Sequence, residues 1–191
     1  MTSISLEPKS TALVLIDLQH GIVARPVAPH PGQQVIENSA RLAAALRKAG
    51  GTVVYVHVLI SEVLTLPSDS PTRDPNAPPP PPIASELVPE AGMQEGDVII
   101  AKRQWGAFYG TGLEQQLRRR GIQTIIMGGI ATNIGVESTA REALDRGYQL
   151  VFAEDAMSSI SAEAHQFAVQ QIFPRMGRVR STEEVLAALA R

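Results

Sequence analysis

The chain alternates short apolar runs with segments in which apolar residues recur at helical spacing. The first run, 11–16 (TALVLI), fits a strand buried on both faces, as strands are in a parallel sheet. The next segment, 33–49, predicts a helix ended by Gly50 and Gly51, because one side of it carries Val35, Ile36, Ala40, Leu42, Ala43 and Leu46.

The same alternation continues through most of the chain. Further strands are predicted at 52–59, 97–101, 123–127, 148–153 and 177–180. Further helices are predicted at 111–120, from Thr132 or Asn133 to Gly147, at 162–173 before Pro174, and from Ser181 onward; Thr111 with Glu114 and Ser181 with Glu184 match capping boxes. This order predicts an α/β fold over residues 1–191: one domain with an open, doubly wound parallel sheet of six strands and helices on both faces.

Residues 60–96 interrupt the pattern. Prolines at 67, 71, 75, 78–82 and 89 are incompatible with a long helix or a central strand, and the run 78–82 favours a polyproline II segment. A loop of this length is usually a lid, a binding loop or an interface arm. A solvated linker is the alternative, but apolar residues are interspersed at Ile83, Leu87 and Val88.

Composition narrows the classes of function. The 191 residues are 44% hydrophobic and 19% charged, with a formal net charge of −2, which gives no reason to expect nucleic acid or membrane partners. Arg118, Arg119 and Arg120 are better explained by the dipole of a helix C-terminus. Neither a signal peptide nor an apolar run of about 20 residues is visible, so a cytoplasmic protein is expected. The chain has no cysteine, which excludes disulfides, thiolate metal sites and a cysteine nucleophile.

Polar residues follow three of the predicted strands. Asp17 comes after the first, Lys102 after the third, and a glycine turn, 128–135, after the fourth. Carboxyl ends of parallel strands line the ligand crevice, so these groups could supply an acid or base, a cation and free backbone N–H groups. Singly, the aspartate could be a cap, the lysine a solvated side chain and the glycines a tight turn. Asp155 competes for the carboxylate role, with loop capping as its alternative.

No metal or cofactor motif is visible. The histidines, His20, His30, His57 and His165, show no ligand-pair spacing, and His57 is expected to be packed and hydrogen-bonded inside a strand. The chain lacks a G-x-S-x-G elbow, and its glycines are not in the G-x-G-x-x-G order. We therefore expect no metal, no dinucleotide and no serine triad.

Five spaced motifs stand out along the chain: LVLIDLQ (13–19), KRQWGAFYGT (102–111), GGIATNIGVESTARE (128–142), AEDA (153–156) and TEEVLAAL (182–189). In this order they resemble the motifs of the isochorismatase-like hydrolases, part of the cysteine hydrolase superfamily. The resemblance implies that Asp17 is the catalytic acid or base and Lys102 the catalytic lysine. It also implies a small-molecule substrate and a homo-oligomer, dimer or tetramer, with contacts through the proline-rich arm or the 134–146 helix.

The resemblance assigns further roles around the glycine turn. It implies a cis peptide bond between Ile130 and Ala131, and an oxyanion site made by the backbone N–H groups of Ala131 and Gly135. Trp105 and Phe108 match aromatic positions beside the pocket; core or interface packing is the alternative for both.

The sequence departs from the family at Gly135, where amide-cleaving members carry their nucleophilic cysteine. Members that hydrolyse isochorismate also lack that cysteine, and they cleave a vinyl ether by protonation from an aspartate and addition of water. Those members have a glutamine at the end of the second strand, where this chain has His57, Val58 and Leu59. The mechanism could therefore carry over without the substrate.

Three hypotheses follow. The first is a hydrolase that uses Asp17 and Lys102 with water as nucleophile on an isochorismate-like vinyl ether. The second is a non-catalytic small-molecule-binding protein that keeps the fold. The third is an amide hydrolase that uses an activated water.

Overall fold

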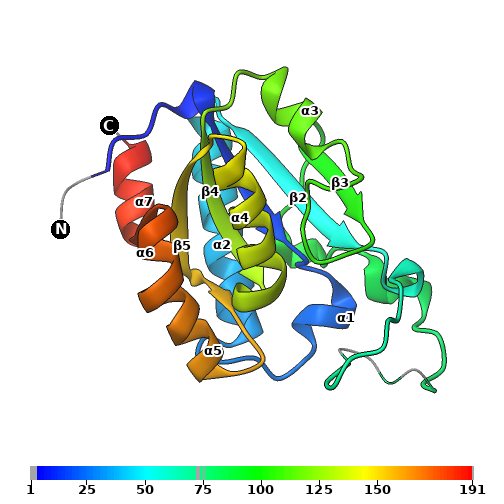
Figure 1. Cartoon of the computed structure of the whole chain (residues 1–191). Coiled ribbons are helices and arrows are strands. Elements are labelled where there is room, and N and C mark those ends of the chain that lie inside the picture. The colour runs from blue at the N-terminus through cyan, green and yellow to red at the C-terminus, as the bar shows by residue number, and fades with distance from the viewer. Residues whose placement is uncertain (1–3, 72–73, 75, 191) are drawn as a thin grey trace.

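The computed structural model describes residues 4–71, 74 and 76–190, and its centre is one parallel sheet (Figure 1). The strand order is β3-β2-β1-β4-β5-β6, and every neighbouring pair is parallel. The strands are β1 (Thr11–Ile16), β2 (Thr52–Val58), β3 (Val98–Lys102), β4 (Thr124–Ile130), β5 (Gln149–Ser158) and β6 (Arg178–Arg180). The predicted six-stranded parallel sheet is confirmed.

Helices cover both faces of the sheet, as predicted. Leu13 and Leu15 of β1 face a core built with α2 (Gly32–Lys48) and α7 (Thr182–Leu189). The alternate β1 residues face the other core, which is built with α3 (Leu113–Arg118), α4 (Glu137–Asp145) and α6 (Phe173–Met176). Figure 1 shows α2 and α4 on opposite sides of the sheet. All six residues of β1 are buried, which is why this central strand reads as a continuous apolar run.

Two helical segments differ from the prediction. A short helix, α1 (His20–Val23), lies between the predicted strand 11–16 and the predicted helix 33–49, where the sequence predicts no regular element. The predicted 162–173 helix is divided into α5 (Ala162–Phe167), a π-helical turn (Ala168–Ile172) and α6. The expectation that Pro174 ends the helix is wrong. Pro174 lies in the first turn of α6, where its missing N–H needs no partner within the helix.

Only one of the two predicted capping boxes forms. The box at Ser181 and Glu184 is present at the start of α7. The predicted box at Thr111 and Glu114 is wrong, because α3 begins at Leu113 with Gly112 at its N-cap. The hydroxyl of Thr111 instead donates to the carbonyl of Ala107 and accepts from the N–H of Leu113 at 3.1 Å. Its bonds therefore belong to the turn before the helix.

Strand β5 extends beyond the predicted 148–153. Its register with β4 shifts between Met127, which pairs with Phe152, and Gly129, which pairs with Met157. Asp155 lies in the irregular stretch that this shift creates. Its Oδ1 accepts hydrogen bonds from the N–H and the hydroxyl of Thr182, both at 2.7 Å. The loop-capping interpretation of Asp155 is confirmed, and its candidacy as the catalytic carboxylate is wrong.

The proline-rich segment has two parts. Leu64 and Leu66 of the first part are exposed. The second part, 82–91, contains two 3-10 turns and is tied to the residues after β1: the N–H of His20 donates to the carbonyl of Glu86, and the N–H of Val88 donates to that of Leu18, both at 3.0 Å. The solvated-linker alternative is therefore wrong for 82–91. None of the helices in the described ranges has the length and apolarity that a membrane span requires.

Candidate active site

Asp17 is the first residue after β1, and its backbone turns sharply there. Its φ is 55°, in the left-handed region, where aspartate is among the more tolerated non-glycine residues. Its N–H donates to the carbonyl of Val56 at 2.8 Å, and its own carbonyl accepts from the N–H of Gln19 at 2.8 Å. Both backbone groups are thus satisfied within the fold, which fixes the direction of the buried side chain.

Lys102 ends β3 and reaches the aspartate across the end of β2. Its Nζ lies 2.9 Å from Oδ2 of Asp17, and the side chains of the lysine and the aspartate are only 2% and 9% exposed. The ammonium also donates to the carbonyl of Trp105 at 2.7 Å. The structure therefore brings together the two charged residues predicted at strand ends.

Gly135 lies directly against this pair. A Cβ placed on it would be 3.2 Å from Nζ of Lys102, 3.3 Å from Oδ2 of Asp17 and 2.9 Å from Cγ2 of Ile16. Any side chain at this position would therefore point at both charged groups and crowd Ile16. The glycine leaves that space open.

Burial dominates the protonation of Asp17. Removal from water raises the pKa of the Asp17 carboxyl above its ordinary value, although Lys102 and, more weakly, His57 act in the opposite direction. Its Oδ1 is buried and has no hydrogen-bond partner among the residues that the structure describes. Such an atom in a native site usually has a role with a ligand or water.

The turn 130–136 forms the part of the cavity wall that contains Gly135. The peptide bond between Ile130 and Ala131 is cis, and the π-helical turn Thr132–Val136 leads into α4. Gly129 before it has a φ of 112°, and a Cβ there would collide with the backbone of Ile16. Only glycine fits this close approach to β1.

The predicted cap at Thr132 or Asn133 is wrong, because no side chain caps the turn. The hydroxyl of Thr132 contacts Nδ1 of His165 at 2.8 Å, and Oδ1 of Asn133 accepts from the hydroxyl of Ser159. These side chains tie the turn to the segments that follow β5 instead.

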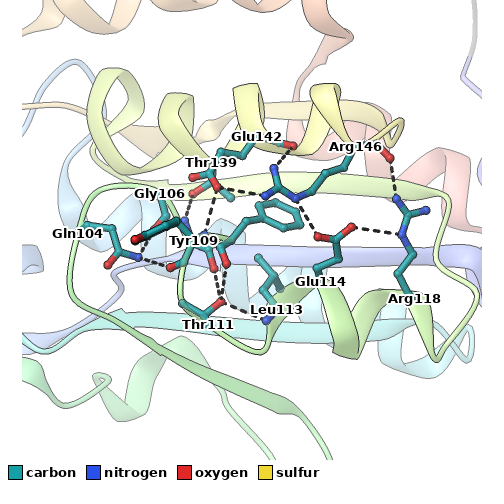
Figure 2. Close-up of polar contacts among 12 residues, drawn as sticks. Gln104, Gly106, Tyr109, Thr111, Leu113, Glu114, Arg118, Thr139, Glu142 and Arg146 are labelled. Atoms are coloured by element: carbon teal, nitrogen blue, oxygen red, sulfur yellow. Dashed lines mark hydrogen bonds and ion pairs between the residues drawn. The ribbon is translucent and has the colours of Figure 1, made fainter.

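Helix α4 holds the segment that carries Trp105 (Figure 2). The N–H of Ala107 donates to Oγ1 of Thr139, and the N–H of Tyr109 donates to Oε2 of Glu142, both at 3.1 Å. This anchoring fixes the Trp105 carbonyl that binds Lys102. The indole of Trp105 borders the cavity and the residue is 53% exposed.

Phe108 is not brought to the cavity. It is 4% exposed, its ring lies 6.0 Å from that of Tyr148, and the guanidinium of Arg146 lies over it at 4.8 Å. The packing alternative describes this residue, and its predicted place beside the pocket is wrong. Because the N–H of the preceding Ala107 is bonded to α4, this part of the segment packs toward the helix and away from the crevice.

The cavity above Asp17 has a volume of about 380 Å³, within the range of small-molecule sites. Six of the seven predicted site residues line it: Asp17, Lys102, Trp105, Ile130, Ala131 and Gly135. The sequence did not identify most of the remaining wall. Residues 18–32 supply Ile22, Arg25 and Val27, and the first part of the proline-rich segment supplies Ile60, Val63, Leu64, Thr65, Leu66, Pro67, Ser68, Ser70 and Pro71. The others are Val58 in β2, Gln104 after β3, Ile134 in the turn before α4 and Ile160 after β5.

Two further polar residues, Gln19 and His57, make hydrogen bonds next to the site without lining the cavity. Gln19, fully buried, accepts from the N–H of Val58 at 2.8 Å and donates to the carbonyls of Val58 at 3.0 Å and Ala84 at 2.9 Å. His57 lies 2.7 Å through Nδ1 from the carbonyl of Ser85, so its predicted hydrogen-bonded role is confirmed. Both residues join β2 to the second part of the proline-rich segment. The LVLIDLQ motif contains Gln19, but nothing in the sequence identifies its partners.

Comparison with known proteins gives one consistent result. A family model described as the isochorismatase domain matches residues 11–184. The uncharacterized isochorismatase family protein YecD of Escherichia coli O157:H7 is 49% identical, over 97% of this chain and 100% of that protein. YwoC of Bacillus subtilis (strain 168), described in the same words, is 48% identical, over 97% of each chain. Ureidoacrylate amidohydrolase RutB of Klebsiella pneumoniae is 38% identical, over 55% of this chain and 45% of that protein.

Solved structures agree with the fold. An isochorismatase family protein from Burkholderia thailandensis superposes with a TM-score of 0.91 at 44% identity, and the alignment covers 100% of both chains. A cysteine hydrolase from Pseudomonas syringae pv. phaseolicola superposes with a TM-score of 0.79 over 98% of this chain and 95% of that one. At 22% identity, that second likeness concerns the fold alone.

Proposed function

We propose that this chain, which belongs to the isochorismatase family and is a hydrolase, cleaves a small molecule through Asp17 and Lys102 with water as the nucleophile. The observation that carries the proposal is the space at Gly135. The acid and the cation are both present, and the position that faces them has no side chain. A covalent step through a thiol is excluded, because the chain has no cysteine.

The protonation of Asp17 supports the role of a general acid. A carboxyl that delivers a proton near neutral pH needs a pKa above its ordinary value. Burial raises the pKa of Asp17 against the opposing effect of the Lys102 ammonium. The Lys102 ammonium lies against Oδ2, and Oδ1 is buried without a partner among the described residues, so one oxygen of the carboxyl is free to be protonated.

A vinyl ether matches this chemistry. The Asp17 carboxyl gives its proton to the terminal carbon of the double bond, and the ether-bearing carbon becomes an oxocarbenium ion. Water adds to that carbon and returns one proton to Asp17, and the resulting hemiketal collapses to a keto acid and an alcohol. The net reaction is addition of one water molecule, and no side-chain nucleophile takes part. Lys102 balances the aspartate charge that appears when the proton leaves.

The charges that line the cavity favour an anionic substrate. Among the described residues that line it, Arg25 and Lys102 are the two basic ones and Asp17 is the one acidic residue. The Nε of Arg25 donates to the carbonyl of Gly21 at 3.1 Å, which orients the guanidinium at the cavity wall. A planar guanidinium suits a carboxylate, so we propose a small substrate that carries a carboxylate beside the bond to be cleaved.

Turnover of isochorismate tests the proposal. The wild-type protein is incubated with isochorismate and with a panel of carboxylated vinyl ethers, amides and esters, and product formation is followed by chromatography. Pyruvate and 2,3-dihydro-2,3-dihydroxybenzoate from isochorismate, at a rate above that of an Asp17→Asn control, support the vinyl ether mechanism with that substrate. Turnover of another vinyl ether supports the mechanism with a different substrate.

The other two hypotheses predict different results in the same panel. Cleavage of amides alone, at a rate that depends on Asp17, favours the water-using amide hydrolase, the reaction class named for the Klebsiella relative. A ligand that binds without turnover, with wild type and Asp17→Asn indistinguishable, favours the binding protein. Either result rejects vinyl ether hydrolysis.

A further inference from the structure

A second cluster of titratable side chains lies outside the cavity that contains Asp17. His30 comes from the loop before α2, Glu154 from the irregular part of β5, and His165 from α5. One ligand atom from each residue lies within 4.8 Å of the others. His165 is buried, and the other two residues are half-buried. The long separation of these residues along the chain explains why histidine spacing gave no metal signal.

The distances within the cluster approach those of a metal centre. The Nε2 of His30 lies 3.3 Å from Oε2 of Glu154, and the Nε2 of His165 lies 3.9 Å from the same oxygen. Tetrahedral zinc with bonds of about 2.0–2.1 Å holds its ligand atoms roughly 3.3 Å apart. We propose that His30, Glu154 and His165 bind a zinc-like divalent transition-metal ion.

The outer contacts of both imidazoles suit metal binding. A metal-ligating histidine donates its other ring N–H to a neighbouring acceptor. The Nδ1 of His165 lies 2.8 Å from the hydroxyl of Thr132, which can accept that hydrogen. The Nδ1 of His30 lies 3.2 Å from the amide of Gln34, which can present its oxygen after a half-turn. With Nδ1 as the protonated nitrogen of each ring, both Nε2 lone pairs can face a metal ion, whose bonds would replace their contacts with Glu154.

The donor set also selects the class of ion. Two imidazole nitrogens and one carboxylate oxygen suit zinc and its transition-metal neighbours, whereas magnesium prefers oxygen ligands and water.

The surroundings leave room for a fourth ligand. The three residues border a cavity of about 440 Å³ that Arg180 and Glu184 also line. The Nε of Arg180 lies 3.9 Å from Oε1 of Glu184, so an acidic partner offsets the one cation in this wall. A water molecule or a small anion can complete a four-coordinate ion here.

Metal binding would join three segments around the active-site turn. His30 follows the bridge between Ala28 and Ser159, and His165 contacts Thr132 at the start of the turn that contains Gly135. An ion at this cluster would therefore brace the wall of the catalytic cavity from its outer side. It would not touch the substrate.

Zinc binding to the purified, chelator-treated chain tests the proposal. Equilibrium dialysis against Zn²⁺ with elemental analysis is expected to give one ion per chain, and dialysis against Mg²⁺ is expected to give none. Substitution of Co²⁺ is expected to give the intense visible absorption of a four-coordinate site. Zn²⁺ is also expected to raise the melting temperature.

Matched variants locate the site. Glu154→Gln and His30→Gln are each expected to weaken zinc binding at least 100-fold and to remove the thermal shift. The controls Glu163→Gln and His20→Gln, which make the same changes outside the cluster, are expected to bind zinc like the wild type. His30 lies in a loop and Glu154 in β5, so His30→Gln keeps the test valid if Glu154→Gln fails to fold.

Three results would overturn the metal site: no zinc bound by the wild type, equal zinc binding by wild type and the His30→Gln variant, or magnesium binding as tight as zinc binding. None of these measurements uses catalytic turnover. Their failure is therefore distinguishable from failure of the proposed hydrolase mechanism.

Discussion

Two acidic side chains, Asp17 and Glu154, lie near the turn 130–136, and their burial, their partners and the direction of their pKa shifts differ. Asp17 lies against Gly135, and Glu154 lies near His165, which contacts Thr132. Asp17 is almost fully buried, one of its oxygens has no partner among the described residues, and burial raises the pKa of its carboxyl. The side chain of Glu154 is 34% exposed and lies beside two imidazoles, and these, first His165 and then His30, lower the pKa of its carboxyl.

The contrast separates a carboxyl that can react from one that can only bind. Asp17 can hold a proton at higher pH than usual, which suits a general acid. Glu154 has a lowered pKa and places one oxygen, Oε2, beside two imidazoles, which suits a fixed ligand or an ion-pair partner. Proximity to the same turn therefore does not give two acids the same role; the number of their partners and their access to water decide it.

Removing the proposed proton donor should have the largest effect. Asp17→Asn keeps the size of the side chain but cannot donate an acidic proton, so kcat/KM is expected to fall by about 10²–10⁴-fold. Steady-state kinetics on whichever substrate the panel identifies measures the loss. The matched control is Asp155→Asn, which should cost about 1 kcal/mol of stability through its cap on α7 and leave kcat/KM within a few-fold. Comparable losses in both variants would refute the assignment of Asp17.

Activity should depend on pH through the same carboxyl. If the protonated form of Asp17 is the reactive one, kcat/KM falls about tenfold per pH unit above its folded pKa, which lies above the ordinary value of 3.8. Lys102 and His57 are the charged and titratable groups that act on Asp17. A pH–rate profile measures this limb, and Asp17→Asn should abolish it. An activity that rises with pH over this range would instead indicate a base.

The raised pKa of Asp17 also determines how the stability of the fold changes with pH. The folded chain binds the Asp17 proton more tightly than the unfolded chain does. Its contribution is therefore fully present below the ordinary pKa and is lost as pH rises toward the folded pKa.

Loss of the buried Lys102 ammonium should lower the free energy of unfolding as well as the activity. Lys102→Met leaves Asp17 buried without its ion-pair partner, and such a change typically costs about 3–5 kcal/mol. Urea unfolding should show a smaller loss at acidic pH, where Asp17 is protonated, and partial recovery in the double variant with Asp17→Asn. Arg103→Met is the control, since it removes an exposed ion pair with Glu62 and should cost less than about 1 kcal/mol. A pH-independent loss would argue against an ionisable partner.

Filling the space beside the pair should give a smaller effect. In Gly135→Ala the new Cβ would lie 2.9 Å from Cγ2 of Ile16, which must shift, so we expect a loss of about 1–2 kcal/mol from overpacking. The methyl group also separates Asp17 from the ligand, and kcat/KM should fall. Gly112→Ala is the control, because a Cβ there meets nothing within 4 Å. Full activity in Gly135→Ala would show that this space is not used by the substrate.

The sequence predicted the sheet and the centre of the site because both depend on short-range patterns. Continuous apolar runs identify buried parallel strands, and polar residues that follow those runs must lie at one edge of the sheet. Asp17, Lys102 and Gly135 were therefore identifiable before their contacts were known. The family resemblance added Trp105, Ile130 and Ala131, while a homo-oligomer stays a prediction.

The rest depended on long-range contacts that no local pattern encodes. Phe108 packs inward because the N–H before it bonds to α4, and Asp155 caps α7 because the register of β5 shifts beside it. The first part of the proline-rich segment lines the cavity, but its prolines only exclude regular structure. His30 and His165 meet at Glu154 through three separate segments, so their spacing carries no signal.

Removing the charge of Glu154 should have the smallest effect and completes the comparison with Asp17. In metal-free protein, Glu154→Gln weakens the charge-assisted contacts with two imidazoles, and the expected loss is about 1 kcal/mol because the side chain is a third exposed. Chemical unfolding in the presence of a chelator measures it, with Glu163→Gln as the control outside the cluster. The decisive comparison is between the loss of kcat/KM in Asp17→Asn and the loss of kcat/KM in Glu154→Gln. Asp17→Asn should affect turnover far more than Glu154→Gln does, and the reverse order would mean that Glu154 is the catalytic carboxylate.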